Sequence, residues 1–208
     1  MKTISLMFSA FSDLAIRYLP QSKKQEGFAF LVHPRGISDL YRKYPFFKYL
    51  PKNLVERIIM LMWPVTLASV DGLVSKKNGE KIRGYIVSIT MTSEQMLKNR
   101  KHATKKITSA VKLAKKKGAM IIGLGSLSSP VMSGGADLVG KHGIFITNGN
   151  ALTAGMTLLG VKEVAKKRKV TLSKSIIAVV GATGSVGQTV SKLLVRDYGI
   201  ARIIIIGS

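Results

Sequence analysis

The sequence predicts an α/β protein with two domains, the first over residues 1–150 and the second over residues 151–208. Short apolar runs alternate with helical patterns from residue 119 onward, and a glycine-rich loop directly follows one of these runs. In addition, 46% of the 208 residues are hydrophobic. Alternating strands and helices are typical of a mostly parallel sheet, and this apolar content is sufficient for a packed core.

The first domain is expected to open with separate helices and strands, whose ends follow from prolines, glycines and apolar runs. In chain order we expect a helix at residues 11–18, a strand at 28–33, a helix at 54–62 and a strand at 82–90. Pro34 ends the first of these strands, and Ser38 is expected to cap a short helix after it. A turn at residues 77–79 precedes the second strand.

A long helix is then expected from Thr92 to about Lys117. Ile107 and Val111 belong to an apolar face at helical spacing. Lysines line another face of the same helix: Lys98, Lys101, Lys105, Lys112 and Lys116. The simplest interpretation of this stripe is a solvated helix face.

Strands and helices alternate regularly in the remainder of the chain. We expect strands at residues 120–125, 144–146, 176–180 and 202–206, with helices at 151–167 and 185–197. The last strand, helix and strand form one βαβ unit of about thirty residues. This unit is the beginning of a Rossmann domain, and it is partial because such a domain needs further strands.

A glycine-rich loop joins the first strand of this unit to its helix. Its residues are Gly181, Ala182, Thr183, Gly184, Ser185, Val186 and Gly187. In such loops the first glycine makes the tight turn, the second lets the backbone approach a phosphate, and the third allows close packing of helix and strand. Free N–H groups at the start of the helix then face a pyrophosphate. The loop therefore predicts a dinucleotide site.

The choice of dinucleotide depends on the residue at the end of the second strand, which contacts the ribose. That position is Gly207-Ser208, and we assign Ser208 to the cofactor site. An acidic residue there would bind the 2′-hydroxyl of NAD and repel a 2′-phosphate. Because neither residue is acidic, the sequence favours NADP(H).

Charge and composition restrict the classes of ligand and partner that the protein is expected to bind. With 33 Lys and Arg against 10 Asp and Glu, the formal net charge is +23, which favours anionic ligands. The sequence has no zinc-ligand spacing and no aromatic RNA-binding motif, so we expect neither a metal nor a specific nucleic acid. Its apolar runs are too short for a membrane-spanning helix, which leaves peripheral membrane contact open. With no cysteine, a cytoplasmic location is expected.

Three segments in fixed order resemble the long-chain acyl-[acyl-carrier-protein] reductases and their bacterial relatives. These segments are residues 118–129, residues 146–154 (Ile-Thr-Asn-Gly-Asn-Ala-Leu-Thr-Ala) and residues 177–187. The resemblance implies reduction of an acyl thioester, on acyl carrier protein or coenzyme A, to a fatty aldehyde by NADPH. It makes the first domain the substrate side, and it offers Lys105 and Lys106 as contacts for a phosphate or the carrier protein.

Three residues are candidate catalytic residues: the same resemblance supplies Asn150 and Thr153, and its place in the fold supplies Ser126, which could equally form a turn. Asn150 and Thr153 are equally suited to capping the helix that follows them, and Ser126 lies in a loop after a buried strand, where α/β folds place ligands. The family holds the acyl group on a cysteine that follows the nucleotide loop, and this sequence contains no cysteine. We therefore expect a truncated chain that is inactive alone.

Two other functions fit the residues. One is an NADP-dependent oxidoreductase similar to shikimate dehydrogenase, acting on a small polar molecule, since that group also places a catalytic domain before a Rossmann domain. The other is a non-catalytic basic protein that retains only the nucleotide loop. The sequence does not indicate an oligomeric state.

Overall fold

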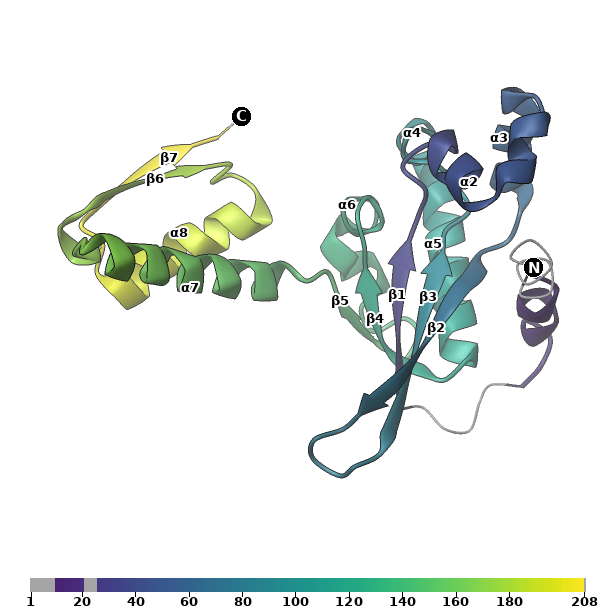
Figure 1. Ribbon diagram of the computed structural model, residues 1–208, viewed down its shortest axis with the longest axis horizontal. Helices are drawn as coiled ribbons and strands as arrows, with labels where there is room; N and C mark the ends of the chain where they lie inside the picture. Colours follow the sequence, from purple (N-terminus) through teal and green to yellow (C-terminus); the bar gives the residue numbers. More distant parts are fainter. Residues whose placement is uncertain (1–9, 21–25, 208) are drawn as a thin grey trace. The chain divides into compact units, whose positions relative to one another are not determined.

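The computed structural model describes residues 10–20 and 26–207, and it divides the chain into two compact units. Unit 1 comprises residues 1–148 and unit 2 comprises residues 149–208. Figure 1 shows the strands of unit 1 in purple to teal and the elements of unit 2 in green to yellow. Among the described residues, no helix is long and apolar enough to cross a membrane.

Unit 1 is built on a five-stranded sheet in the order β2-β3-β1-β4-β5. Its strands are β1 (Gly27–Val32), β2 (Val65–Val74), β3 (Lys81–Ser88), β4 (Ala119–Leu124) and β5 (Phe145–Thr147). β1 pairs in parallel with both β3 and β4, β4 pairs in parallel with β5, and only β2 is antiparallel to its neighbour. This mostly parallel sheet confirms the expected α/β class.

The helices of unit 1 gather on one face of the sheet and beyond its carboxyl edge (Figure 1). They are α2 (Ile37–Lys43), η1 (Pro45–Tyr49), α3 (Lys52–Leu61), α4 (Ser93–Lys98), α5 (Arg100–Lys116), α6 (Ser128–Val131) and η2 (Ser133–Leu138). α5 packs on the sheet, and its Ile107 and Val111 are fully buried together with Leu31 of β1 and Ile122 of β4. The expected apolar face of this helix therefore forms the core of unit 1.

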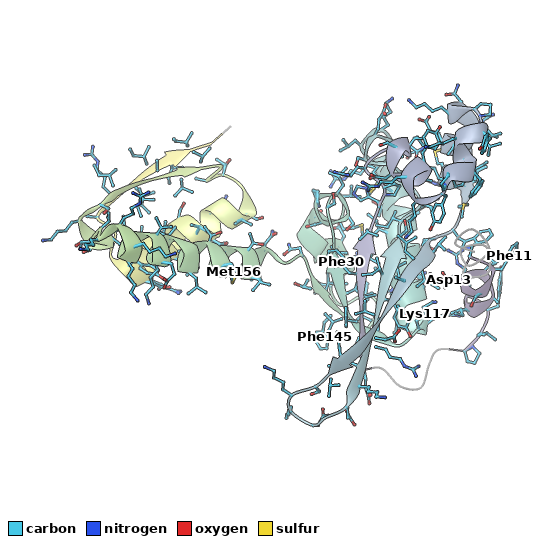
Figure 2. All side chains as sticks on the ribbon, viewed as in Figure 1. Phe11, Asp13, Phe30, Lys117, Phe145 and Met156 are labelled. Atoms are coloured by element: carbon cyan, nitrogen blue, oxygen red, sulfur yellow. The ribbon has the colours of Figure 1, made fainter. Side chains whose placement is uncertain are left out.

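The opposite face of the same sheet is apolar and exposed. Phe30 of β1, Ile121 of β4 and Phe145 of β5 have exposed fractions of 42%, 44% and 67%. Figure 2 labels Phe30 and Phe145 on this side of the sheet. Parallel sheets are usually covered on both faces, whereas the described residues of unit 1 cover only one face of this sheet.

Two expectations for unit 1 are wrong in detail. The helix expected from Thr92 to Lys117 is two helices, because Asn99 leaves the helical conformation and its side chain caps α5 by accepting from the N–H of His102. Thr92, where the helix was expected to start, caps α4 in a capping box with Gln95. Ser38 caps no helix, since α2 begins at Ile37 with Gly36 at its N-cap.

Strand β2 was not expected from the sequence. Its pairing with β3 shifts register twice, between Thr66 and Ala68 and between Val70 and Leu73. Each irregularity breaks the alternation of apolar and polar residues by which a half-exposed strand is recognised. β2 therefore lacks the pattern that identified the other strands.

Unit 2 contains a two-stranded parallel sheet and two long helices. Its elements are α7 (Asn150–Arg168), η3 (Leu172–Lys174), β6 (Ile176–Val180), α8 (Ser185–Tyr198) and β7 (Arg202–Ile206). Both strands have the bounds expected from the sequence. They pair in parallel, and α8 is the helix that connects them. Leu158 of α7 and Leu194 of α8 pack together in the core of the unit, against the inner face of this sheet.

A buried carboxylate attaches the N-terminal helical residues 10–16 to the edge of the unit 1 sheet. Asp13 is fully buried. It accepts hydrogen bonds from the N–H and hydroxyl of Thr66, and it lies 2.7 Å from the ammonium of Lys117. Asp13 and Lys117 lie close together in Figure 2. This carboxylate joins β2, the end of α5 and the N-terminal helical residues.

We expect Asp13→Ala to lower the free energy of unfolding by about 3 kcal/mol, because it leaves the mostly buried Lys117 ammonium and two Thr66 donors without their acceptor. Urea unfolding followed by circular dichroism measures this change. Asp71→Ala is the control, since Asp71 is exposed and accepts only from Ser69; its effect should stay within about 0.5 kcal/mol. Equal effects of the two substitutions would contradict a structural role for Asp13.

Candidate functional site

The glycine loop of unit 2 has the backbone geometry that a dinucleotide loop requires. Gly181 has a φ of 76°, in the left-handed region that favours glycine. A Cβ atom added to Gly187 would lie 2.2 Å from the carbonyl oxygen of Gly181. Only a glycine at position 187 therefore lets the first turn of α8 approach the loop so closely.

The first turn of α8 presents unpaired backbone donors. The N–H of Gln188 bonds to the carbonyl of Gly184, whereas the N–H groups of Ser185, Val186 and Gly187 have no acceptor among the described residues. No side chain caps this end of the helix. Such free N–H groups, together with the positive end of the helix dipole, attract phosphate. The described residues of this loop therefore fit the pyrophosphate of a dinucleotide.

The loop is fixed against the end of β7. The N–H groups of Gly181 and Ala182 both donate to the carbonyl of Ile206, at 2.8 and 3.1 Å. Gly207 lies so close to Thr183 that a Cβ atom at position 207 would be 2.4 Å from the Thr183 methyl carbon. The strand end that we expect to contact the ribose is thus adjacent to the loop. Ser208, the other residue assigned there, lies outside the described residues.

Asn150 contacts the same loop. Its side-chain amide donates to the hydroxyl oxygen of Ser185 at 2.6 Å, which joins the start of α7 to the start of α8. The Ser185 hydroxyl then accepts from Asn150 and keeps its own proton for another acceptor. Asn150 therefore helps to orient a hydroxyl at the candidate phosphate site. This contact between residues 35 positions apart had no signal in the sequence.

Thr153 lies on α7 with Asn150, whereas Ser126 belongs to unit 1. Thr153 is exposed on α7, and its hydroxyl donates to the carbonyl of Gly149 one turn earlier. Ser126 belongs to unit 1, where it is exposed at the carboxyl end of β4 with a φ of 49°. Among the described residues, the Thr153 side chain bonds to no residue of the glycine loop. Their proposed catalytic roles remain predictions.

Unit 1 contains a cavity of about 440 Å³ at the carboxyl edge of β1 and β3. Its walls come from the ends of these strands, from α2 and η1, from the end of α3, and from the start of β2. Most of the lining is apolar; Leu40, Phe47, Ile59 and Val65 are examples. Small-molecule sites in proteins have volumes of about 300–1,000 Å³ and mostly apolar linings. This cavity is therefore large enough for a small molecule.

A buried lysine supports the walls of this cavity and was misassigned from the sequence. Lys106 was grouped with Lys105 as a contact for an external phosphate, but it is only 7% exposed. Its ammonium donates to the carbonyls of Ile59, Met62 and Thr90 and to the Thr90 hydroxyl. Burial, with a smaller effect of the Arg17 charge, lowers the pKa of Lys106 to about 8. Lys106 thus connects these segments through hydrogen bonds inside the protein.

No pattern in the sequence indicated directly that Lys106 is buried, although position 106 lies beside the apolar Ile107. A lysine one residue from a core position at helical spacing is at the edge of the buried face. The exposed Lys105 retains the solvated position expected for it. Within the described part of the chain, no group of three metal-binding side chains occurs.

Two of the three histidines, His33 and His102, bond to the backbone. His33 lines the cavity, where one ring nitrogen lies 3.1 Å from the Pro34 carbonyl and the other accepts from the N–H of Leu127. His102 bonds to the carbonyl of Met60. With both nitrogens of its ring engaged, His33 positions the loop after β4.

Fold and site together define a mixed α/β protein whose second unit contains a Rossmann-type βαβ segment with a glycine-rich loop. No family model matches the chain. Its similarity to known proteins is distant. It is 28% identical over 141 residues to a long-chain acyl-[acyl-carrier-protein] reductase of Synechococcus elongatus, which covers 64% of this chain and 41% of that protein.

A second match is the aminotransferase PigE of a Serratia species. The two are 24% identical over 178 residues, covering 82% of this chain and 20% of that protein. The chain therefore spans about two fifths and one fifth of the lengths of these two relatives. These matches give a distant likeness to a reductase, which agrees with the coarse class expected from the motifs.

We expect the stability of the protein to depend on the ionisation of Lys106. Since its pKa is about 8 in the folded protein and the ordinary value is 10.5, the unfolded chain binds more protons between these pH values. The free energy of unfolding should therefore rise with pH in this window. Relative to Lys106→Met, the unsubstituted protein should gain on the order of 2 kcal/mol between pH 8 and pH 10.

Urea unfolding of both proteins at pH 7, 8, 9 and 10 measures this difference. Lys105→Met is the matched control, because the neighbouring Lys105 is exposed, and its curve against pH should run parallel to that of the unsubstituted protein. A Lys106→Met curve that is also parallel would mean that the buried ammonium does not titrate in this range.

Proposed function

We propose that this protein is an oxidoreductase that binds NADP(H) through the loop of residues 181–187 and takes part in the reduction of an acyl thioester to an aldehyde. The observation that carries the proposal is the set of three unpaired N–H groups at Ser185, Val186 and Gly187, within a βαβ unit. The likeness to an acyl-[acyl-carrier-protein] reductase supports the substrate class.

The residues of the loop have separate tasks in this proposal. The N–H groups of the first turn of α8 bind the pyrophosphate, and the helix dipole strengthens that attraction. Ser185, held by Asn150, donates its hydroxyl proton to a phosphate oxygen. Gly207 lies at the strand end that is expected to contact the ribose. It has no acidic side chain, which favours a 2′-phosphate. The nicotinamide supplies the hydride when NADPH is bound.

The acyl partner follows from the charge and from the likeness to the reductase. An acyl carrier protein and coenzyme A both carry negative charge, which a chain of net charge +23 attracts. Transfer of the acyl group from a thioester requires a thiolate or another activated nucleophile. Because this sequence has no cysteine, we propose that residues outside this chain supply the group that accepts the acyl chain.

NADPH binding tests the cofactor assignment. We expect NADPH to bind more tightly than NADH, and we expect Gly187→Ala to weaken NADPH binding at least about tenfold because its methyl group displaces the Gly181 carbonyl. Fluorescence titration of NADPH measures both affinities. Gly155→Ala, whose methyl group on α7 meets open space, is the control and should bind as the unsubstituted protein does. Equal affinity in the two variants would refute the site.

A turnover measurement tests whether the group that accepts the acyl chain lies outside this chain. We expect the 208-residue chain to bind NADPH yet to leave palmitoyl-coenzyme A unreduced, since it has no thiol to form an acyl intermediate. Absorbance at the NADPH band over time, with product analysis for aldehyde, is the measurement. Steady aldehyde formation by the chain alone would show that a thiol is not required, and would contradict the proposed external nucleophile.

A further inference from the structure

Helix α7 is apolar on two sides, and the core of unit 2 uses only one of them. Ala154 and Leu158 are buried in that core. Leu152, Met156 and Leu159 lie on the opposite side of the helix, in line because they are four and three residues apart, and their exposed fractions are 71%, 58% and 54%. Figure 2 labels Met156 on this helix. We call these three exposed residues the α7 stripe.

Exposed basic residues follow the α7 stripe along the same helix. They form a basic cluster of five residues: Lys162, Lys166, Lys167, Arg168 and Lys169. Glu163 is the only acidic residue of α7, so residues 162–169 have a net charge of +4. Positive charge in the last turn stabilises a helix through its dipole. The dipole, however, explains neither Lys162, which lies before the last turn, nor the exposed apolar residues beside the cluster.

The composition of this surface distinguishes between three kinds of anionic partner. Nucleic acid is attracted by basic residues alone, which gives no reason for the exposed α7 stripe. Protein interfaces are enriched in aromatic residues and arginine and depleted in lysine, whereas α7 has no aromatic residue and the cluster has four lysines and one arginine. Lysine is a flexible point charge that needs no fixed geometry. Apolar residues beside such charges are typical of helices that bind anionic lipid surfaces.

The sheet of unit 2 has an exposed apolar face as well, but that face differs from α7 in charge. Ile176, Val180 and Ile204 are exposed on its outer side, together with Arg202, which pairs with Ile176. No cluster of basic residues adjoins them on β6 or β7. Faces of parallel sheets are usually covered by helices rather than by lipid. Of the two apolar surfaces, only α7 therefore combines apolar residues with a basic cluster.

We infer that α7 binds the surface of a membrane that contains anionic lipids, with the α7 stripe at the boundary of headgroups and acyl chains and the basic cluster on the lipid phosphates. The helix lies in the plane of the surface, because the lysines of its last two turns stay with the headgroups. This inference goes beyond the proposed function and does not depend on it, since no residue of the loop 181–187 takes part. It also gives a role to part of the net charge of +23.

Co-sedimentation of the full chain with lipid vesicles tests the inference. One set of vesicles contains phosphatidylcholine and phosphatidylserine in equal parts, and the other contains phosphatidylcholine alone. We expect at least about tenfold tighter binding to the vesicles with phosphatidylserine. This preference should disappear when the salt concentration rises from about 0.1 M to about 1 M, because the screening length falls from about 10 Å to about 3 Å. Equal binding to both sets of vesicles, or binding to neither, would overturn the inference.

Two triple variants of equal charge locate the basic contact. The first combines Lys162→Gln, Lys166→Gln and Lys167→Gln, and it should bind the phosphatidylserine vesicles at least about tenfold more weakly. The second is the control and removes three exposed lysines of α5 by Lys101→Gln, Lys105→Gln and Lys112→Gln. Its binding should change by at most about twofold. Equal effects of the two variants would mean that the net charge of the whole chain attracts the vesicles, and would overturn the assignment to α7.

Tryptophan fluorescence tests whether the α7 stripe enters the lipid. In Met156→Trp the added indole should emit at shorter wavelength when phosphatidylserine vesicles are present, because it leaves water. Leu97→Trp is the control, since Leu97 is 68% exposed beside Lys98 on α4, and its emission should not change. A circular dichroism melt verifies that each variant is folded. Unchanged emission of Met156→Trp would show that the stripe stays in water and would overturn the proposed insertion.

Self-association is the competing use of the same apolar residues, and sedimentation velocity detects it. We expect the full chain without lipid to show no dimer that depends on the α7 stripe, because basic clusters on two copies repel each other. A chain that binds no vesicles, and whose dimer is broken by combining Met156→Ser with Leu159→Ser, would overturn the membrane assignment and give the stripe to a second copy.

Discussion

The organisation of unit 1 depends on a single buried ammonium group that has no carboxylate partner. A charge in this position costs free energy unless polar groups replace its water, and in this fold the acceptors are the backbone carbonyls at the end of α3 and at Thr90. Carbonyls at the end of a helix suit this task, since they lack partners within the helix and carry the negative end of its dipole. The Lys106 contacts therefore join α5 to the end of α3 and to Thr90 after β3, and Ile59, Met62 and Thr90 line the cavity.

Both candidate sites use the same general feature of parallel sheets, in which the carboxyl ends of the strands meet at one edge. In unit 1 that edge holds the cavity beyond β1 and β3, and in unit 2 it holds the glycine loop beyond β6. Loops that follow parallel strands are free to vary while the sheet keeps its register. The two edges differ in chemistry, since one offers apolar walls and the other offers backbone donors.

Unit 2 could be predicted closely from sequence because each of its features is local. The strand, the three glycines and the helix follow one another within about thirty residues, and both strand bounds agree with the structure. The features that escaped prediction are those that depend on distant residues or on irregular backbone. Asn150 reaches Ser185 across 35 positions, Lys106 is buried by α3, and β2 loses its alternation at two shifts of register.

One glycine separates side chains that are bonded into different units. Asn148 donates to the Gly134 carbonyl in unit 1, and Asn150 donates to Ser185 in unit 2, while Gly149 between them has a φ of 76°. The chain passes from one unit to the other here, at a residue whose left-handed backbone conformation favours glycine. Since Asn150 also contacts Ser185 of the glycine loop, the first anchored side chain of unit 2 belongs to the proposed nucleotide site.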